Sequence, residues 1–386
     1  MFSQTIHPLS PTVNEIKNAA NGLPALHLAT NVTTSNPKTN GMKSTLFPKA
    51  GFLAALSALL FLLCCEGYLR SKGFEPTYND DKALWAQKRA EIYQPRDKAT
   101  VFIGSSRIKF DLDIPTWKNL TGENAVQLSL VGTSPMLLLK DLAEDEKFRG
   151  KLIVDLTEVL FFSQNPVFHK SAKEAINFYK NQSPSEQLSS RINFALESQF
   201  AFLEERRFSM NTLLNDLEIP NRPGVFVVPP FPKGFEWTTF DRQTYMSDMF
   251  LTDSTDIKRQ TSIWSVLIMS DKTPPIDGKV LQETFDEIKL AVDKIKSRGG
   301  QVVFIRTPSS GPMEEGEQKV YPRQKYWDAL LTYTNTPGIH YLDNPVTASL
   351  ICPEWSHLAP KDAVVYTREL IKSLQQKSWF AAQPTL

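Results

Sequence analysis

The sequence predicts an α/β protein with three layers, a parallel sheet between two layers of helices, preceded by one transmembrane helix. Short apolar stretches alternate with segments of helical periodicity from residue 99 onward. These stretches are apolar on both faces, as parallel strands are when helices cover each side of the sheet. An uncharged apolar run, 50–65, precedes that region and predicts the transmembrane helix.

Composition excludes several classes of protein. The chain of 386 residues is 41% hydrophobic and 22% charged, which is typical of a globular protein. Its net charge of +1 gives nucleic-acid binding no electrostatic support, so we expect no nucleic-acid partner. Cys64 and Cys65 are adjacent and Cys352 stands alone, which predicts neither a disulfide framework nor a metal knuckle. The sequence also lacks a glycine-rich phosphate loop, and we expect neither a metal nor a cofactor.

Residues 1–45 predict a disordered tail, because they are rich in Thr, Asn, Ser and Pro and show no periodicity. Met42 is followed by Lys43 and then by the apolar run, which resembles the start of a signal-anchored protein. The sequence leaves open whether translation starts at Met1 or at Met42.

Residues 46–66 predict an uncleaved signal-anchor helix. The apolar run is longer than a signal-peptide core and close to a span of about 20 residues. No small-x-small cleavage site follows it, and Leu63 stands where a lipoprotein needs a small residue. A buried core helix is the alternative. Lysines before the run slightly favour a cytoplasmic amino terminus. We therefore expect a single-pass protein of a bacterial inner membrane, with its C-terminal domain in the periplasm or outside the cell.

A linker with one helix, at 82–93 within 67–98, leads into the α/β domain, 99–386. Serine followed by proline at 134 and at 183 predicts helix starts, with serine as N-cap and proline at the first helical position. Glycines at 299 and 300 end a helix that begins at 281. We expect strands at 99–104, 125–130, 151–156, 301–305 and 338–343, and helices at 134–148, 183–205, 281–298, 326–334 and 360–376.

The region at about 160–280 interrupts this alternation and predicts a mostly helical insertion or cap. Its aromatic side chains could line a substrate groove, although ordinary packing of the insertion is favoured. They are Phe231, Phe235, Trp237, Phe240, Tyr245 and Phe250.

The first predicted strand ends in Gly104-Ser105-Ser106-Arg107, at the edge of the sheet where α/β proteins place their chemistry. A serine there becomes a nucleophile only when a base removes its proton. Of the five histidines, His357 has the most suitable position, in the loop before the final helix. Glu354 precedes it by three residues, so its carboxylate can reach one imidazole nitrogen while the other faces a hydroxyl.

In these motifs and their order the chain resembles the SGNH, or GDSL-like, hydrolase superfamily over roughly 99–374, apart from the insertion. Gly104-Ser105-Ser106-Arg107 lies where the family has Gly-Asp-Ser-Leu, and Gly132 lies where it has an oxyanion-hole glycine. Glu354 and His357 lie where it has Asp-x-x-His. The resemblance implies a flavodoxin-like sheet and a catalytic triad of Ser106, His357 and Glu354. It also implies that the N–H groups of Ser106 and Gly132 form the oxyanion hole.

The chain departs from the family pattern at three places. Ser105 and Arg107 replace the Asp and Leu that flank the nucleophile, and Glu354 is one methylene longer than the family's Asp. The family's Gly-x-Asn after the third strand is absent, and only Thr157 there could donate to the oxyanion. Loss of one oxyanion donor can cost about 2.7–4 kcal/mol of transition-state stabilisation.

The predicted function is hydrolysis of an O-acyl ester, of an envelope glycan or a lipid. The alternatives are an O-acyltransferase acting on a cell-surface polysaccharide and an inactive membrane-anchored binding or assembly module. The expected partner is an acylated small molecule or polysaccharide, and the oligomeric state stays open. Arg107 and Arg306 could bind an anionic substrate group or form structural salt bridges.

Overall fold

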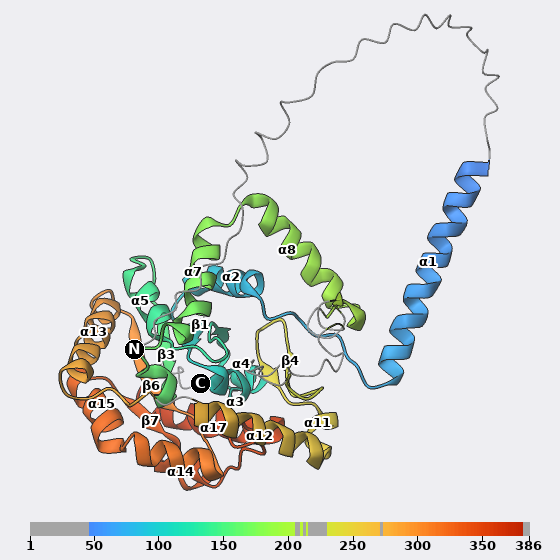
Figure 1. Ribbon diagram of the computed structural model, residues 1–386. Helices are drawn as coiled ribbons and strands as arrows, with labels where there is room; N and C mark the ends of the chain where they lie inside the picture. The colour runs from blue at the N-terminus through green and yellow to red at the C-terminus, as the bar shows by residue number, and fades with distance from the viewer. Residues whose placement is uncertain (1–45, 205–208, 211–213, 215–229, 271–272, 381–386) are drawn as a thin grey trace, which may run out of the picture. The chain divides into compact units, whose positions relative to one another are not determined.

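The computed structural model describes residues 46–204, 209–210, 214, 230–270 and 273–380. Its main unit is an α/β fold around a five-stranded parallel sheet, which confirms the predicted class (Figure 1). The chain divides into two compact units, 1–58 and 59–386. The predicted tail, with Met42, lies outside the described residues.

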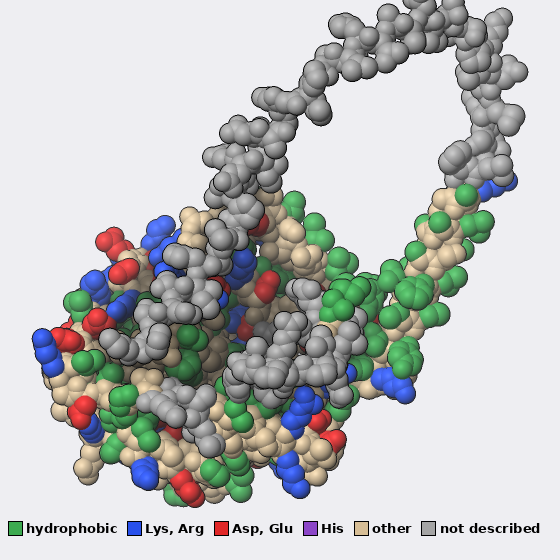
Figure 2. Space-filling view, viewed as in Figure 1, with side chains coloured by type: hydrophobic (Ala, Val, Ile, Leu, Met, Phe, Trp, Pro, Cys, Tyr) green, Lys and Arg blue, Asp and Glu red, His purple; other side chains and the backbone are tan. Residues whose placement is uncertain are grey.

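Helix α1 (Leu46–Ser71) contains the apolar run and continues past the predicted end at residue 66. Within the described part of the chain, its segment 49–71 is the one helix long and apolar enough to cross a membrane. Figure 2 shows apolar side chains along this helix and basic side chains at its two ends. The structure therefore contains one candidate transmembrane helix.

The strands of the main sheet lie in the order β2-β1-β3-β6-β7. Each neighbouring pair is parallel, and Phe102 on β1 lies in register with Gln127 on one side and Ile153 on the other. All five predicted strands are confirmed, with bounds β1 (Ala99–Ile103), β2 (Asn124–Gln127), β3 (Lys151–Asp155), β6 (Gln301–Arg306) and β7 (Gly338–His340).

Two strands end earlier than their apolar residues predict. After β2, the N–H groups of Leu128 and Leu130 still donate to the carbonyls of Phe102 and Gly104, at 2.8 and 3.2 Å, but the chain between them is irregular. After β7, the chain forms a 3-10 turn over Tyr341–Asp343. Past β2 the apolar residues Leu128 and Leu130 remain buried beside the sheet, and past β7 Tyr341 is buried whereas Leu342 is exposed.

Alternate side chains of the strands enter two separate cores. Val101, Ile103 and Val154 belong to a cluster with residues of α5 (Met136–Glu144) and α13 (Gly278–Ser297). Phe102 and Ile153 instead pack with residues of α3 (Ser106–Asp111), α4 (Ile114–Thr121) and α17 (Pro360–Gln376). Both faces of the sheet are therefore buried, as the doubly apolar strands predict.

The helices of the main unit connect these strands. They are α2 (Lys82–Ala90), α3 (Ser106–Asp111), α4 (Ile114–Thr121), α5 (Met136–Glu144), α6 (Glu158–Phe161), α13 (Gly278–Ser297), α14 (Gly311–Val320), α15 (Ala329–Thr334), α16 (Pro345–Ala348) and α17 (Pro360–Gln376). The expected bounds of α17 are confirmed, but α3, α4 and α14 were not predicted. A π-helical turn, Gln324–Asp328, leads into α15, so the predicted start at residue 326 was early for the α-helix itself.

The two serine-proline helix starts have different outcomes. Ser183 forms a capping box with Glu186 and begins α8 (Pro184–Glu197), which ends well before the expected residue 205. At the other start, Pro135 takes the N-cap position itself, so α5 begins at Met136 rather than at 134. Ser134 lies one residue farther out, where its hydroxyl accepts the Met136 N–H at 3.4 Å.

The insertion is mostly helical where it is described, as predicted. It contains α7 (Lys170–Asn181), α8, α11 (Asp248–Thr252) and α12 (Ser254–Ser270). A short antiparallel hairpin, β4 (Trp237–Thr238) with β5 (Thr244–Tyr245), was not predicted. Arg242 in this hairpin has φ = +63°, a left-handed conformation that its sequence does not signal.

Candidate active site

Ser106 lies at a tight turn between β1 and α3. Gly104 is needed there, because a Cβ at this position would lie 2.6 Å from Asp155 Cβ and 2.8 Å from Ile108 Cγ2. Ser105 follows as the N-cap of α3, and its hydroxyl accepts the Arg107 N–H at 3.4 Å. Ser105 is buried, whereas Ser106, the first helical residue, is half-buried. Of the two adjacent serines, only Ser106 is partly open to solvent.

His357 joins Ser106 to Glu354. Its Nε2 lies 2.9 Å from Ser106 Oγ and its Nδ1 lies 2.9 Å from Glu354 Oε1. With the proton on Nδ1, the imidazole donates to the carboxylate, and Nε2 can accept the serine proton. The structure thus brings together the three residues predicted as a triad, although 251 residues separate Ser106 from His357.

Glu354 is completely buried, and four N–H donors satisfy its carboxylate. Oε1 accepts the ring N–H and the backbone N–H of His357, the latter at 2.6 Å, together with the backbone N–H of Ser356 at 3.3 Å. Oε2 accepts the indole N–H of Trp264, on α12 of the insertion. A buried carboxylate with this many donors is held in one orientation.

The loop that carries Glu354 and His357 is hydrogen-bonded to neighbouring segments at the same edge of the sheet. The carbonyl of Trp355, a residue with φ = +78°, accepts the Ser310 N–H at 2.9 Å. The Ser310 hydroxyl in turn accepts the Cys352 N–H, also at 2.9 Å. After the histidine, the N–H of Leu358 donates to Asp111 Oδ1 on α3 at 2.9 Å. These bonds link the loop to α3 and to Ser310, the N-cap of α14 in the segment that follows β6, so its position is set by elements at this edge of the sheet.

Aromatic rings surround the imidazole of His357. The ring centroids of Phe110, Phe235 and Trp264 lie 4.2, 5.9 and 6.0 Å from that of the histidine. Phe110 comes four residues after Ser106, a spacing that reveals its position once α3 is known. The sequence did not identify Trp264, because no local pattern in the insertion indicates that its indole N–H donates to Glu354.

The aromatic side chains proposed for a substrate groove are largely used in packing. Phe231 and Phe235 contact Trp264, and Phe235 and Phe250 pack in one cluster with Phe110. Elsewhere, Trp237 contacts Tyr245 across the hairpin, and Phe240 lies against Tyr78 and Phe194. These contacts support the packing interpretation, except that Phe235 also lies against the triad histidine.

Thr157, the weaker oxyanion candidate, has its hydroxyl engaged elsewhere. It donates to Asp155 Oδ2 at 3.2 Å and lies 2.8 Å from Ser105 Oγ. Thr307 donates to the other oxygen of Asp155 at 3.0 Å. Burial raises the pKa of Asp155, although Arg306 and Arg107 oppose that shift. Because a hydroxyl has one proton, Thr157 cannot donate to an oxyanion while it donates to Asp155.

Gly132 lies on an exposed turn after β2 with φ = +59°. A Cβ there would meet no atom within 4 Å, so this glycine is favoured by its backbone conformation rather than by crowding. Its role as an oxyanion donor stays a prediction.

Arg107 and Arg306 are buried and paired with carboxylates. Arg107 forms a bidentate pair with Glu317, and Arg306 binds Glu317 at 2.6 Å and Glu158 at 2.8 Å. Burial alone would raise the pKa of Glu317, but the two guanidinium groups outweigh burial and lower it to about 2. Both arginines therefore form structural salt bridges, which the sequence analysis gave as the alternative to binding an anionic substrate group.

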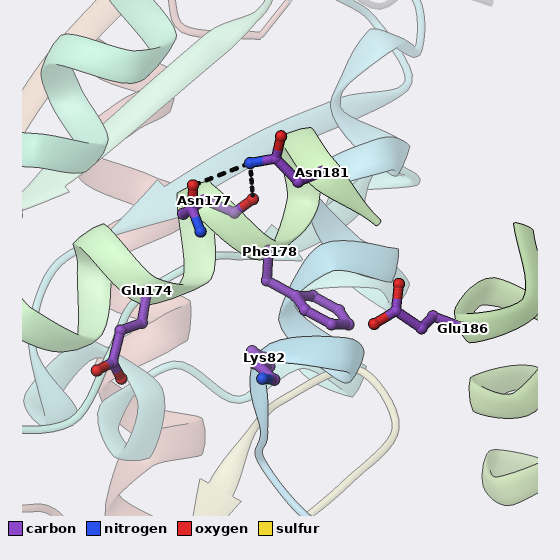
Figure 3. A pocket seen from close by; sticks show the side chains of 6 residues that line it. All are labelled: Lys82, Glu174, Asn177, Phe178, Asn181 and Glu186. Atoms are coloured by element: carbon purple, nitrogen blue, oxygen red, sulfur yellow. Dashed lines mark hydrogen bonds between the residues drawn. The ribbon is translucent and has the colours of Figure 1, made fainter. Parts of the chain in front are cut away.

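The described residues contain no cluster of three or more His, Cys, Asp or Glu side chains placed to hold a metal ion. A surface pocket of about 370 Å³ lies between α2, α7 and α8. In Figure 3, Phe178 points between Lys82 and Glu186, while the Asn181 amide donates to Asn177. None of the predicted triad residues lines this pocket.

Compared with known proteins, the chain matches no family model, and no curated protein sequence matches it either. The site must therefore be interpreted from its own geometry.

Proposed function

We propose that this protein is a serine-dependent ester hydrolase of the SGNH, or GDSL-like, type that acts on an O-acyl ester. The observation that carries the proposal is the position of His357, within 2.9 Å of both Ser106 Oγ and Glu354 Oε1. This is the arrangement of nucleophile, base and orienting acid that acyl transfer requires.

In the proposed reaction, Ser106 Oγ attacks the ester carbonyl while its proton passes to His357 Nε2. Glu354 stabilises the imidazolium that forms. The proton then passes to the leaving alcohol, and an acyl-serine remains. His357 next removes a proton from water, which attacks the acyl-serine, releases the carboxylic acid and restores the serine.

The N–H groups of Ser106 and Gly132 would receive the developing oxyanion. Ser106 is the first residue of α3, and the first N–H groups of a helix have no acceptor within it. With the hydroxyl of Thr157 engaged by Asp155, the site would depend on backbone donors alone. We therefore expect slow turnover, consistent with the absent side-chain donor.

The strand order supports the finer features of the proposed fold. The order β2-β1-β3-β6-β7 corresponds to the 2-1-3-4-5 order of flavodoxin-like sheets, and separate cores on its two faces fit three layers. With α1 as a signal anchor in a bacterial inner membrane, the domain 99–386 would lie in the periplasm or outside the cell. Its substrates there would be envelope glycans or lipids.

An O-acyltransferase is the second candidate, and the apolar surroundings of His357 favour it. Phe110, Phe235 and Trp264 restrict water near the base. A sugar hydroxyl that displaces water could then accept the acyl group from Ser106. An inactive binding module has less support, because an unused site has no need for the hydrogen bonds that orient His357.

Labelling by a fluorophosphonate tests the nucleophile. We expect the full chain in detergent to be labelled and to hydrolyse short-chain aryl esters, and Ser106→Ala to lose both properties. His357→Ala should lose turnover as well. The matched control is Ser105→Ala, which should still be labelled. Labelling that persists in Ser106→Ala and disappears in Ser105→Ala would reject the assignment.

A further inference from the structure

Helix α8 (Pro184–Glu197) carries an aligned apolar stripe on its surface. Leu188, Ile192 and Leu196 follow one another at intervals of four residues and are 60, 53 and 45% exposed. The one buried side chain of this helix is Phe194. At about 100° per residue, Ile192 lies about 160° around the helix from Phe194, so the stripe faces away from the protein body. Figure 2 shows apolar side chains on the outer surface over this helix.

This stripe is a candidate contact surface. Single exposed aliphatic residues are normal, but three on one face give a helix the pattern of an amphipathic element. Amphipathic helices in proteins gain most of their stability from burying the apolar face. Here that face points away from the described core, and its three side chains stay 45–60% exposed.

The end of α1 indicates what this surface contacts. Glu66 accepts the backbone N–H groups of Ala201 and Phe202, at 3.0 and 3.3 Å. Arg70 donates to the carbonyl of Gln199 at 3.0 Å. Gln199 follows Leu196 by three residues, a distance of at most ~10 Å even in extended chain. The stripe therefore begins within a short distance of the last turns of α1.

These last turns are where a bilayer would end if α1 is the membrane span. Glu66 is the first charged residue after the apolar run, and charged side chains mark the edge of the hydrocarbon. Tyr68, two residues after Glu66, is 61% exposed, and the rings of Phe200 and Phe202, in the segment that Glu66 binds, have centroids 5.4 Å apart. Aromatic side chains gather at such interfaces.

We propose that Leu188, Ile192 and Leu196 form a lipid-contacting face, and that α8 lies on the membrane surface beside the end of α1. Interfacial helices bury their apolar face by about 5–10 Å at the boundary of headgroups and acyl chains. A second contact of this kind would add to the hydrogen bonds of Glu66 and Arg70 in orienting the domain toward the bilayer. The inference takes α1 as the membrane span and does not depend on the proposed catalysis.

Spin-label accessibility in liposomes tests this contact. The full chain, with Cys64 and Cys65 changed to serine, would be reconstituted in phosphatidylethanolamine and phosphatidylglycerol. A label at Ile192→Cys should collide several-fold more with oxygen, which partitions into lipid, than with a water-soluble nickel chelate. The matched control is Val320→Cys, an exposed aliphatic position at the end of α14 that should show the opposite preference. Leu59→Cys on α1 serves as the lipid-facing reference.

The three labels separate the outcomes. If Leu59 is lipid-exposed while Ile192 is as open to the chelate as Val320, the lipid-contacting face is rejected and α1 still spans the membrane. If the label at Ile192 is shielded from both reagents, another protein surface covers the stripe, either a second copy or another segment of this chain, and the proposal is also rejected.

Discussion

Glu354 shows how a single side chain can join two parts of the chain. Its Oε1 organises its own loop by accepting both N–H groups of His357, while its Oε2 binds Trp264 of the insertion. The insertion therefore contributes to the candidate site, although it interrupts the α/β pattern in sequence. A glutamate reaches one methylene farther than the aspartate of the family pattern, and here that longer side chain meets the indole.

Replacing Trp264 with Phe removes the indole N–H and keeps an aromatic ring. A hydrogen bond to a charged group contributes about 1.5–3 kcal/mol, and 1.4 kcal/mol corresponds to tenfold in rate. We expect kcat to fall about tenfold, and KM to change little because the ring remains.

Trp85→Phe is the matched control, because its indole N–H also forms a buried hydrogen bond, to the Leu128 carbonyl at 2.8 Å, away from the triad. It should lower stability and leave kcat unchanged. Equal losses of kcat in both variants would show that Trp264 acts on folding rather than on Glu354.

At the scale of elements, the turn from β1 to α3 decides where Ser106 lies. Its geometry depends on close approach of Gly104 to Asp155 on the neighbouring strand β3. Ser106 follows β1, Asp155 ends β3, and the loop of His357 is hydrogen-bonded to Ser310 in the segment after β6, so these groups meet at one edge of the sheet. The sheet order, rather than any single motif, places them together.

Gly104→Ala should destabilise the fold by about 1–3 kcal/mol, the range for overpacking in a core. The new methyl group would overlap Asp155 Cβ, which cannot move without shifting β3. Urea unfolding of the full chain in detergent measures this loss. Ester turnover should fall as well, because the shift moves Ser106 away from His357.

The control is Gly316→Ala, at an exposed position within α14 where a Cβ would meet nothing within 4 Å. It should stabilise the chain by about 0.5–1 kcal/mol, because alanine is the better helix former. If Gly104→Ala is as stable as the wild type, Gly104 does not approach Asp155 as closely as the structure shows.

At the scale of the whole molecule, stability should depend on pH through His340 at the end of β7. Burial, together with Arg306 and Arg323, lowers the pKa of this imidazole to about 3. In the unfolded chain the pKa is about 6.5. The neutral imidazole therefore contributes fully to the free energy of unfolding above pH 6.5. This contribution is lost as the pH falls from 6.5 toward 3, because the unfolded chain binds the proton first. By pH 5 the loss should reach about 2 kcal/mol.

His340→Asn isolates this contribution. His340 Nδ1 accepts the N–H of Leu342 at 3.2 Å, and an asparagine oxygen can accept the same bond without titrating. Between pH 7 and 5, we expect the free energy of unfolding of the variant to fall by about 2 kcal/mol less than that of the wild type. If the free energy of unfolding falls equally with pH in the two proteins, His340 does not cause the loss of stability.

The sequence by itself determined the α/β class, the five strands, the apolar helix near the amino terminus and the final helix α17. These features depend on apolar periodicity and on capping within a few residues, as in the capping box of Ser183 and Glu186. It also singled out Ser106, Glu354 and His357, because a strand end and a three-residue spacing are local signals. Their catalytic role remains a proposal.

Only the tertiary structure decided which distant groups meet. It brought Ser106 to His357, placed Trp264 on Glu354, engaged Thr157 with Asp155 and paired Arg107 and Arg306 with buried carboxylates. It also ended β2 at Gln127, where the local pattern predicts strand to residue 130. Such partners depend on strand order and on how the insertion packs, and these depend on long-range contacts that no short stretch of sequence encodes.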